Sequence, residues 1–136
     1  MELHSKREIR RKITAEDFTP PLLVNEMLDK LPSEVFIDPS KTFIDPAAGN
    51  GNFLVEVLSR KLSNSHPPLI ALSTIFAVEL MEDNTIEMKE RLLALIPLEL
   101  HEEAKIILDK NIICSDAFRW DFENWRPKEK KSKPLF

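Results

Sequence analysis

The sequence contains little of what disulfide-bonded, metal-binding or membrane-spanning proteins need. Cys114 is the only cysteine, and the three histidines are scattered, so neither a disulfide framework nor a metal cluster is expected to organise the chain. No apolar run approaches the roughly 20 residues of a membrane span, and the first residues do not resemble a secretory signal. We therefore expect one soluble, cytoplasmic domain of 136 residues, without a metal and without a membrane partner.

Charge is unevenly distributed along the chain, although the net charge is only −4. Residues 1–12 carry five basic and two acidic groups, residues 126–136 carry five and one, and the segment between carries nine and twenty. A nucleic-acid-binding surface would have to come from the two ends, and the alternative is that both ends are solvated tails. We predict a basic N-terminal segment (1–13), a domain (14–125) and a basic C-terminal tail (126–136).

Glycine is also scarce, because the chain has only Gly49 and Gly51. A short apolar run that ends at Asp45 precedes them, and an apolar-periodic segment from Phe53 to about Leu62 follows. This order predicts a strand, a tight loop and a helix. Glycine allows positive φ angles and close approach of a ligand to the backbone, and the start of a helix offers unpaired N–H groups.

Two familiar nucleotide-binding loops do not fit this stretch. No Gly-Lys-Ser/Thr follows, as a phosphate loop requires, and Leu54 stands where a dinucleotide fingerprint needs a third glycine. A Gly-x-Gly alone is also typical of an ordinary strand-to-helix turn. Residues 45–54 as a whole, Asp-Pro-Ala-Ala-Gly-Asn-Gly-Asn-Phe-Leu, are more specific. They closely resemble the S-adenosylmethionine-binding motif of the N6-adenine DNA methyltransferases found in restriction-modification systems and in phages.

This resemblance implies a fold and a cofactor. The implied fold is α/β, a Rossmann-like S-adenosylmethionine-dependent methyltransferase fold. Its partial parallel sheet is flanked by helices and preceded by an N-terminal helical segment. The implied cofactor is S-adenosyl-L-methionine, and within the motif the residues that would bind it are Asp45, Ala47, Gly49 and Gly51.

A Thr-Pro-Pro segment precedes the glycine loop. From the residues alone, Pro21 is well placed as the first residue of an amphipathic helix that Pro32 ends. In the resembling enzymes a Thr-Pro segment stands at this place, and its threonine contacts the carboxylate end of the cofactor. The resemblance therefore makes Thr19 a cofactor-binding candidate. Residues 32–41 are interpreted as a connection, with a turn at Asp38-Pro39.

A second strand is predicted at residues 75–78, and Glu79 directly follows it. A carboxylate at the tip of a parallel strand beside a glycine loop can hold an adenosine ribose through its two hydroxyls. Glu79 lies 28 residues beyond Gly51, more than the roughly 20 of a minimal unit, and we attribute the excess to an insertion at residues 66–72. The alternative is a solvated strand end. Leu80 would lie against the adenine ring.

Residues 83–96 and 98–110 predict two helices that serve as packing elements, and residues 111–114 predict a third strand. Within this strand, Cys114 is interpreted as a small buried apolar residue. In the resembling family an acidic residue after this strand accepts a hydrogen bond from the adenine amino group, and Asp116 stands at that position. Phe118 would offer apolar surface to the ring or pack in the core.

The catalytic motif of the resembling family is not found after Asp116. That motif, Asn- or Asp-Pro-Pro followed by Tyr or Phe, ends the fourth strand and contacts a base rotated out of the duplex. His66-Pro67-Pro68 has neither the amide nor the aromatic ring, and the Pro-Pro of the N-terminal segment is already assigned. The resemblance covers about residues 14–118, and no catalytic residue is assigned in this chain.

Three explanations of the missing motif stay open. The chain is a fragment of a longer methyltransferase, one half of a split enzyme, or a small protein that binds the cofactor for another purpose. The expected partners are DNA and either a second chain that supplies the catalytic strand or another copy, joined at an open sheet edge. The alternative function is a non-enzymatic regulator or partner subunit. A nicotinamide dinucleotide enzyme is a third hypothesis, disfavoured by the missing third glycine.

Overall fold

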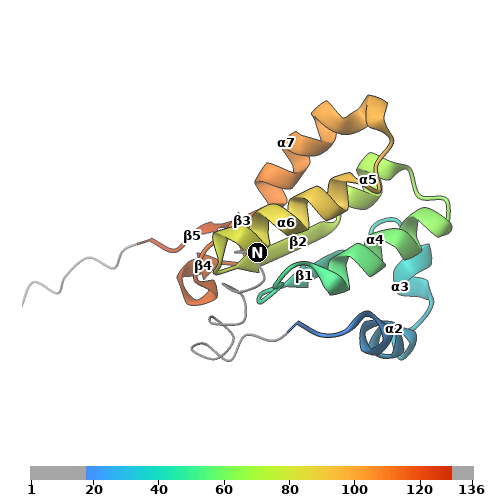
Figure 1. The fold of residues 1–136 in the computed structure, drawn as a ribbon, viewed down its shortest axis with the longest axis horizontal. Helices are drawn as coiled ribbons and strands as arrows, with labels where there is room; N and C mark the ends of the chain where they lie inside the picture. The colour runs from blue at the N-terminus through green and yellow to red at the C-terminus, as the bar shows by residue number, and fades with distance from the viewer. Residues whose placement is uncertain (1–17, 130–136) are drawn as a thin grey trace, which may run out of the picture.

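A parallel sheet of three strands lies at the centre of the computed structural model, which describes residues 18–129 (Figure 1). The strands are β1 (Phe43–Asp45), β2 (Ile75–Glu79) and β3 (Ile112–Cys114), in the order β1-β2-β3. Asp45 pairs with Ala77 and Glu79 pairs with Cys114, so the carboxyl ends of the three strands lie along one edge of the sheet. The predicted α/β class and parallel sheet are confirmed in this form.

Helices follow each of the first two strands. Helix α4 (Asn52–Ser63) and α5 (Pro68–Ser73) connect β1 to β2, and α6 (Glu82–Leu93), a 3-10 turn at Leu98–Leu100 and α7 (His101–Asn111) connect β2 to β3. These helices share one apolar core with the sheet. Alternate residues of a strand point to opposite faces, and Ile75, Ala77 and Ile112 point into this core.

The N-terminal helices lie beside α4. Helix α2 spans Pro21–Asp29, with Pro21 as its first residue as predicted, and it packs on α4 through the buried residues Val24 and Leu28. Helix α3 (Glu34–Ile37) lies within the segment that was interpreted as a connection. It is a single turn, and the burial of Phe36 against Phe43 stabilises it, which is a tertiary contact that the local sequence does not reveal.

The opposite face of the sheet carries a small hairpin that the sequence analysis did not predict. After a 3-10 turn at Ala117–Arg119, β4 (Trp120–Asp121) pairs antiparallel with β5 (Arg126–Pro127). Trp125 packs against Phe76, with ring centroids 4.9 Å apart, and its indole N–H donates to the carbonyl of Lys110. Aromatic contacts therefore fasten the hairpin to the face that the helices leave open.

Parts of the predicted domain organisation lie outside the described residues. The basic segment at residues 1–13 is one, and the tail beyond residue 129 is another. The first residues of the predicted tail, Arg126 and Pro127, form β5. Within residues 18–129 no helix is both long and apolar enough to cross a membrane.

Candidate functional site

The glycine loop follows β1 at the carboxyl edge of the sheet, as the sequence predicts. Both glycines have left-handed backbone conformations, with φ of +56° at Gly49 and +90° at Gly51. Gly51 caps the start of α4, and its N–H donates to the carbonyl of Ala48 at 3.0 Å. The N–H of Ala48 in turn donates to Val78 of β2. The loop is thus a strand-to-helix turn tied to two strands, and it requires glycine at both positions.

A small cavity of about 100 Å³ lies on this loop. Thr19, Asp45, Ala47 and Gly49, four of the predicted site residues, contribute to its lining, which comprises Phe18, Thr19, Asp45, Ala47, Ala48, Gly49, Asn50, Asn52 and Phe53. The structure therefore brings these four residues together from two segments that are distant in sequence. Gly51 does not line the cavity, because it faces Met88 of α6 instead.

The segment before α2 closes the cavity from the other side. The carbonyl of Thr19 accepts a 2.7 Å hydrogen bond from Nδ2 of Asn52, the first residue of α4. The ring of Phe18 lies so close to Gly49 that a Cβ atom there would be 2.9 Å from Cδ1 of the ring. Side chains from the N-terminal segment and from α4 thus hold the two walls of the cavity in contact.

Glu79 ends β2 as predicted and is buried beside the loop. Its Oε1 atom accepts the N–H of Gly49 at 2.9 Å, and Oε2 accepts from the N–H of Met81 and from Nδ2 of Asn84 at 3.0 and 3.1 Å. A carboxylate offers about four acceptor positions, so protein donors already use most of them. A ligand hydroxyl pair at Glu79 would have to compete with the Gly49 amide.

The cavity is rich in acceptors. Burial and the nearby charge of Glu79 raise the pKa of Asp45, against the opposing effect of a hydrogen bond from the N–H of Ala47. Asn50 also lines the cavity, and its side-chain oxygen is buried without a hydrogen-bond partner. Asp45 therefore places one carboxylate in the wall of the cavity, and the buried carboxylate of Glu79 lies beside it without lining it. This local surplus of acceptors suits a ligand that carries donors or positive charge.

Leu80 and Asp116 are not part of this cavity, although both lie at the same edge of the sheet. Leu80 follows β2 and is 64% exposed. Asp116 follows β3, and its Oδ1 accepts the N–H of Phe118, so the carboxylate caps the 3-10 turn there. Phe118 is 86% exposed, which makes the core alternative for this residue wrong.

The prediction that Cys114 is buried is also wrong. Its side chain is exposed, because it ends β3 at the edge of the sheet, where no further strand of the described residues pairs with it. Its thiol contacts the carbonyl of Leu80 at 3.5 Å. Residue type alone favours burial of a cysteine, but the place of β3 at the edge of the sheet exposes this one.

A wider cavity of about 600 Å³ adjoins the first one at Ala47. Its walls are Pro46, Ala47 and the turn and hairpin after β3, with an apolar lining from Ala117, Phe118, Trp120 and Phe122 and polar groups from Asp121 and Lys128. Asp121 accepts hydrogen bonds from Glu123 and Asn124, which lower its pKa, so this carboxylate is occupied by its own turn. The hairpin residues of this cavity were missed, since no sequence motif marks them.

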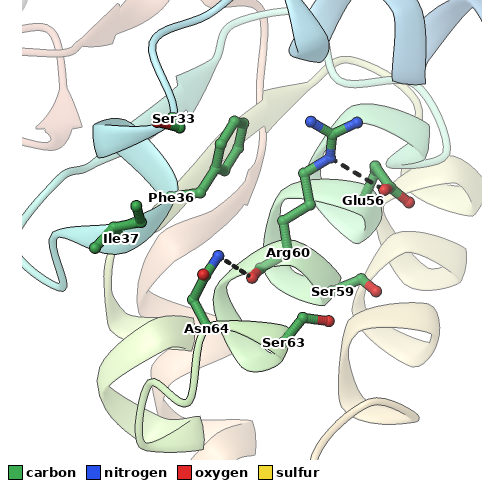
Figure 2. Close-up of a pocket in the computed structure, with 8 residues that line it drawn as sticks. All are labelled: Ser33, Phe36, Ile37, Glu56, Ser59, Arg60, Ser63 and Asn64. Atoms are coloured by element: carbon green, nitrogen blue, oxygen red, sulfur yellow. Dashed lines mark hydrogen bonds and ion pairs between the residues drawn. The ribbon is translucent and has the colours of Figure 1, made fainter.

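A third cavity, of about 340 Å³, lies between α3 and the second half of α4 (Figure 2). Among the described residues that line it, Arg60 is the only cation. Its guanidinium is balanced by Glu56 and Asp29 at 3.2 and 2.8 Å and also donates to Asn25. Asn64 donates to the carbonyl of Arg60. These groups satisfy one another, so we do not interpret this cavity as a binding site for a charged ligand.

These observations define a class: an α/β protein with a glycine loop and two carboxylates at the carboxyl edge of a parallel sheet. Among residues 18–129 no group of three metal-binding side chains occurs. Compared with models of protein families, with curated proteins and with solved structures, the chain has no significant match in any of the three.

Proposed function

We propose that this chain binds S-adenosylmethionine, as the Rossmann-like cofactor-binding domain of an N6-adenine DNA methyltransferase-like protein. The catalytic Asn/Asp-Pro-Pro-Tyr/Phe motif would come from outside residues 1–136. Two independent features support this proposal. One is the resemblance of residues 45–54 to the cofactor motif of those enzymes, and the other is the chemistry of the cavity on that loop.

The acceptor-rich cavity is the observation that carries the proposal. S-adenosylmethionine carries an ammonium group, a sulfonium and two ribose hydroxyls. The carboxylate of Asp45 in the cavity wall and that of Glu79 beside the cavity complement these groups. A nicotinamide dinucleotide would instead bring a pyrophosphate to the same loop. Two nearby carboxylates disfavour that anion, so the electrostatics and the missing third glycine agree.

In this proposal the cofactor extends along the carboxyl edge of the sheet. Thr19 and the backbone N–H groups of the glycine loop hold the carboxylate end, Asp45 faces the ammonium, and Glu79 binds the ribose after Gly49 releases it. Leu80 and Asp116 take the adenine ring at the ends of β2 and β3. The cofactor supplies an activated methyl group, and the chain supplies its orientation.

The free edge of β1 favours a second component. Within the described residues β1 is an edge strand, and Ile44 at its middle is 49% exposed, whereas strands of parallel sheets are normally covered. A strand added parallel to β1 would end beside Asp45 and the 600 Å³ cavity. A catalytic segment would reach the cofactor from there, and so would a regulatory partner, which keeps the non-enzymatic alternative in place.

Calorimetric titration tests the cofactor proposal. We expect the wild type to bind S-adenosylmethionine and S-adenosylhomocysteine but not NAD, and we expect Asp45→Ala and Glu79→Ala to weaken binding at least about tenfold. Asp38→Ala is the matched control, because Asp38-Pro39 repeats the Asp-Pro pair away from the loop, where its carboxylate accepts hydrogen bonds from Ser40. Binding of NAD in place of the two methionine ligands would contradict the proposal.

Transfer of a labelled methyl group to DNA separates the enzyme from the non-enzymatic alternative. The assay is run with this chain alone and with candidate partners that carry the missing motif. Methylation of adenine only in the presence of such a partner would identify a split enzyme. Cofactor binding with no transfer in any combination would favour the regulator.

A further inference from the structure

Two side chains of α6, Met88 and Arg91, contact the glycine loop directly, and a third, Asn84, contacts Glu79, which binds the loop. Asn84, Met88 and Arg91 are spaced by four and three residues, which places them on one face of the helix. From the sequence alone this helix is expected only to pack against the sheet. We propose that α6 sets the conformation of the glycine loop, with Asn84 and Arg91 as positioning residues for the ligand site.

Asn84 acts through Glu79. Its side chain is fully buried and donates from Nδ2 to Oε2 of Glu79 at 3.1 Å. The N–H of Met81 donates to the same oxygen at 3.0 Å. With Oε2 held by two donors, Oε1 is fixed toward the N–H of Gly49 at 2.9 Å. Asn84 therefore determines where the carboxylate points, and the carboxylate determines where the loop amide points.

Arg91 acts on the other end of the loop. Its Nη1 atom donates to the carbonyl of Asn50 at 2.9 Å and to Oδ1 of Asn52 at 2.8 Å. Because arginine can only donate, this contact leaves Nδ2 of Asn52 to donate to Thr19 at 2.7 Å. One guanidinium thus connects α6 to the loop and, through Asn52, to the segment that closes the cavity.

Met88 lies between these two contacts, under Gly51. A Cβ atom at Gly51 would be 2.6 Å from Cγ of Met88, so the loop backbone rests directly on the helix. A segment with two glycines has many accessible conformations in isolation. The hydrogen bonds on either side of Met88 select one of them, and residues that never touch the ligand can therefore control its affinity.

The two glycines provide the test. They are the only glycines in the chain, so their backbone amides can be assigned in a ¹H–¹⁵N spectrum from selectively labelled protein. We expect Asn84→Ala to shift the Gly49 amide and speed its hydrogen exchange about tenfold, and Arg91→Met to shift the Gly51 amide. Lys89→Met, which removes a partly buried cation that pairs with Asp109, and Asn111→Ala, which removes a buried amide on α7, should shift neither.

The conservative variant Arg91→Lys keeps the test valid if Arg91→Met unfolds the chain. Lysine keeps the charge, but its ammonium lies one bond closer to the backbone than Nη1, which donates to both acceptors, so the loop amide should still shift while the other resonances stay in place. Unchanged glycine amides in Arg91→Lys and in a folded Asn84→Ala variant would overturn the proposal. So would equal shifts in the two control variants.

The expected effect of these residues on ligand binding rests on the proposed function and is tested in a separate experiment. We expect Asn84→Ala and Arg91→Met to weaken S-adenosylhomocysteine binding about tenfold. We expect Asn84→Ala to add nothing in a Glu79→Gln background, because both changes release the same carboxylate contact. Full additivity would overturn the relay through Glu79. If the wild type binds no such ligand but the glycine shifts occur as stated, the cofactor proposal fails and the role of α6 in ordering the loop stands.

Discussion

The two ends of the parallel sheet both bury charge, but they satisfy it in opposite ways. At the amino ends of β1 and β2, Lys61 is 0% exposed, and its ammonium donates to the carbonyl of Lys41 at 2.6 Å and to the hydroxyl of Thr74 at 2.7 Å. It also lies 5.2 Å from the centre of the Phe43 ring. Protein groups thus surround this cation.

At the carboxyl ends of the same two strands, the balance is reversed. Asp45 accepts one backbone N–H and faces the like charge of Glu79, and the oxygen of Asn50 nearby has no partner. A buried charge therefore serves the stability of the fold where the chain itself supplies its hydrogen-bond partners. Where the chain supplies a surplus of acceptors instead, as at Asp45, we propose that a ligand with complementary groups balances them.

The strongest test of this difference is Lys61→Ala. It removes the donor to the carbonyl of Lys41 and to the hydroxyl of Thr74 and opens a cavity under α4, so we expect the free energy of unfolding in urea to fall by about 3 kcal/mol or more. Affinity of the folded variant for S-adenosylhomocysteine should not change. Lys61→Met keeps the volume and removes the buried charge, so it should cost about half as much. A loss of affinity without a loss of stability would contradict the structural role of Lys61.

The second effect concerns the glycine loop. Gly51→Ala meets both a positive φ and the side chain of Met88, so we expect a loss of about 2–3 kcal/mol in the free energy of unfolding. Gly49→Ala should cost about 1 kcal/mol, because the Phe18 ring that it meets can shift. Urea denaturation of the two variants compares them directly. A larger loss of stability in Gly49→Ala than in Gly51→Ala would show that the N-terminal segment, and not α6, supports the loop.

A third and smaller effect should distinguish function from stability at Asp45. Because its pKa is raised above 3.8, its contribution to stability is present at low pH and is lost as the pH rises through the folded pKa. At pH 7 we expect Asp45→Asn to be more stable than the wild type by less than about 1 kcal/mol, and to bind S-adenosylhomocysteine less tightly. The stability difference should shrink near pH 3.8. If Asp45→Asn had both a lower free energy of unfolding and a lower ligand affinity than the wild type at pH 7, Asp45 would be identified as structural.

The smallest expected effect is the alkaline pH dependence of Lys61. Burial lowers its pKa below 10.5, so the unfolded chain binds its proton more tightly than the folded protein. Titration of Lys61 therefore increases the free energy of unfolding as the pH rises from the pKa of Lys61 in the folded protein toward 10.5. Thermal unfolding of the wild type and Lys61→Met, both in a Cys114→Ser background, measures it, and the chain has no tyrosine to complicate the comparison. Parallel curves for the two proteins would contradict the assignment.

Local signals account for what the sequence predicted correctly. Two glycines between an apolar run and an amphipathic segment locate the loop, Pro21 locates the start of α2, and Glu79 marks the end of β2. The contacts that fix the loop join residues 30 to 41 positions apart, such as Glu79 with Gly49 and Arg91 with Asn50. No periodicity or motif encodes such pairs, so Asn84, Arg91 and the hairpin after β3 became visible only in the fold.

The aromatic hairpin also gives the protein a built-in optical reporter. Trp120 and Trp125 are the only tryptophans of the chain, and their ring centroids are 5.4 Å apart on the face of the sheet that the helices do not cover. Trp125 has a φ of +52°, an unfavourable conformation for a residue with a side chain, which the surrounding rings must compensate. Intrinsic fluorescence will therefore report on the docking of the hairpin as the protein is heated, and the two glycine amides will report on the loop.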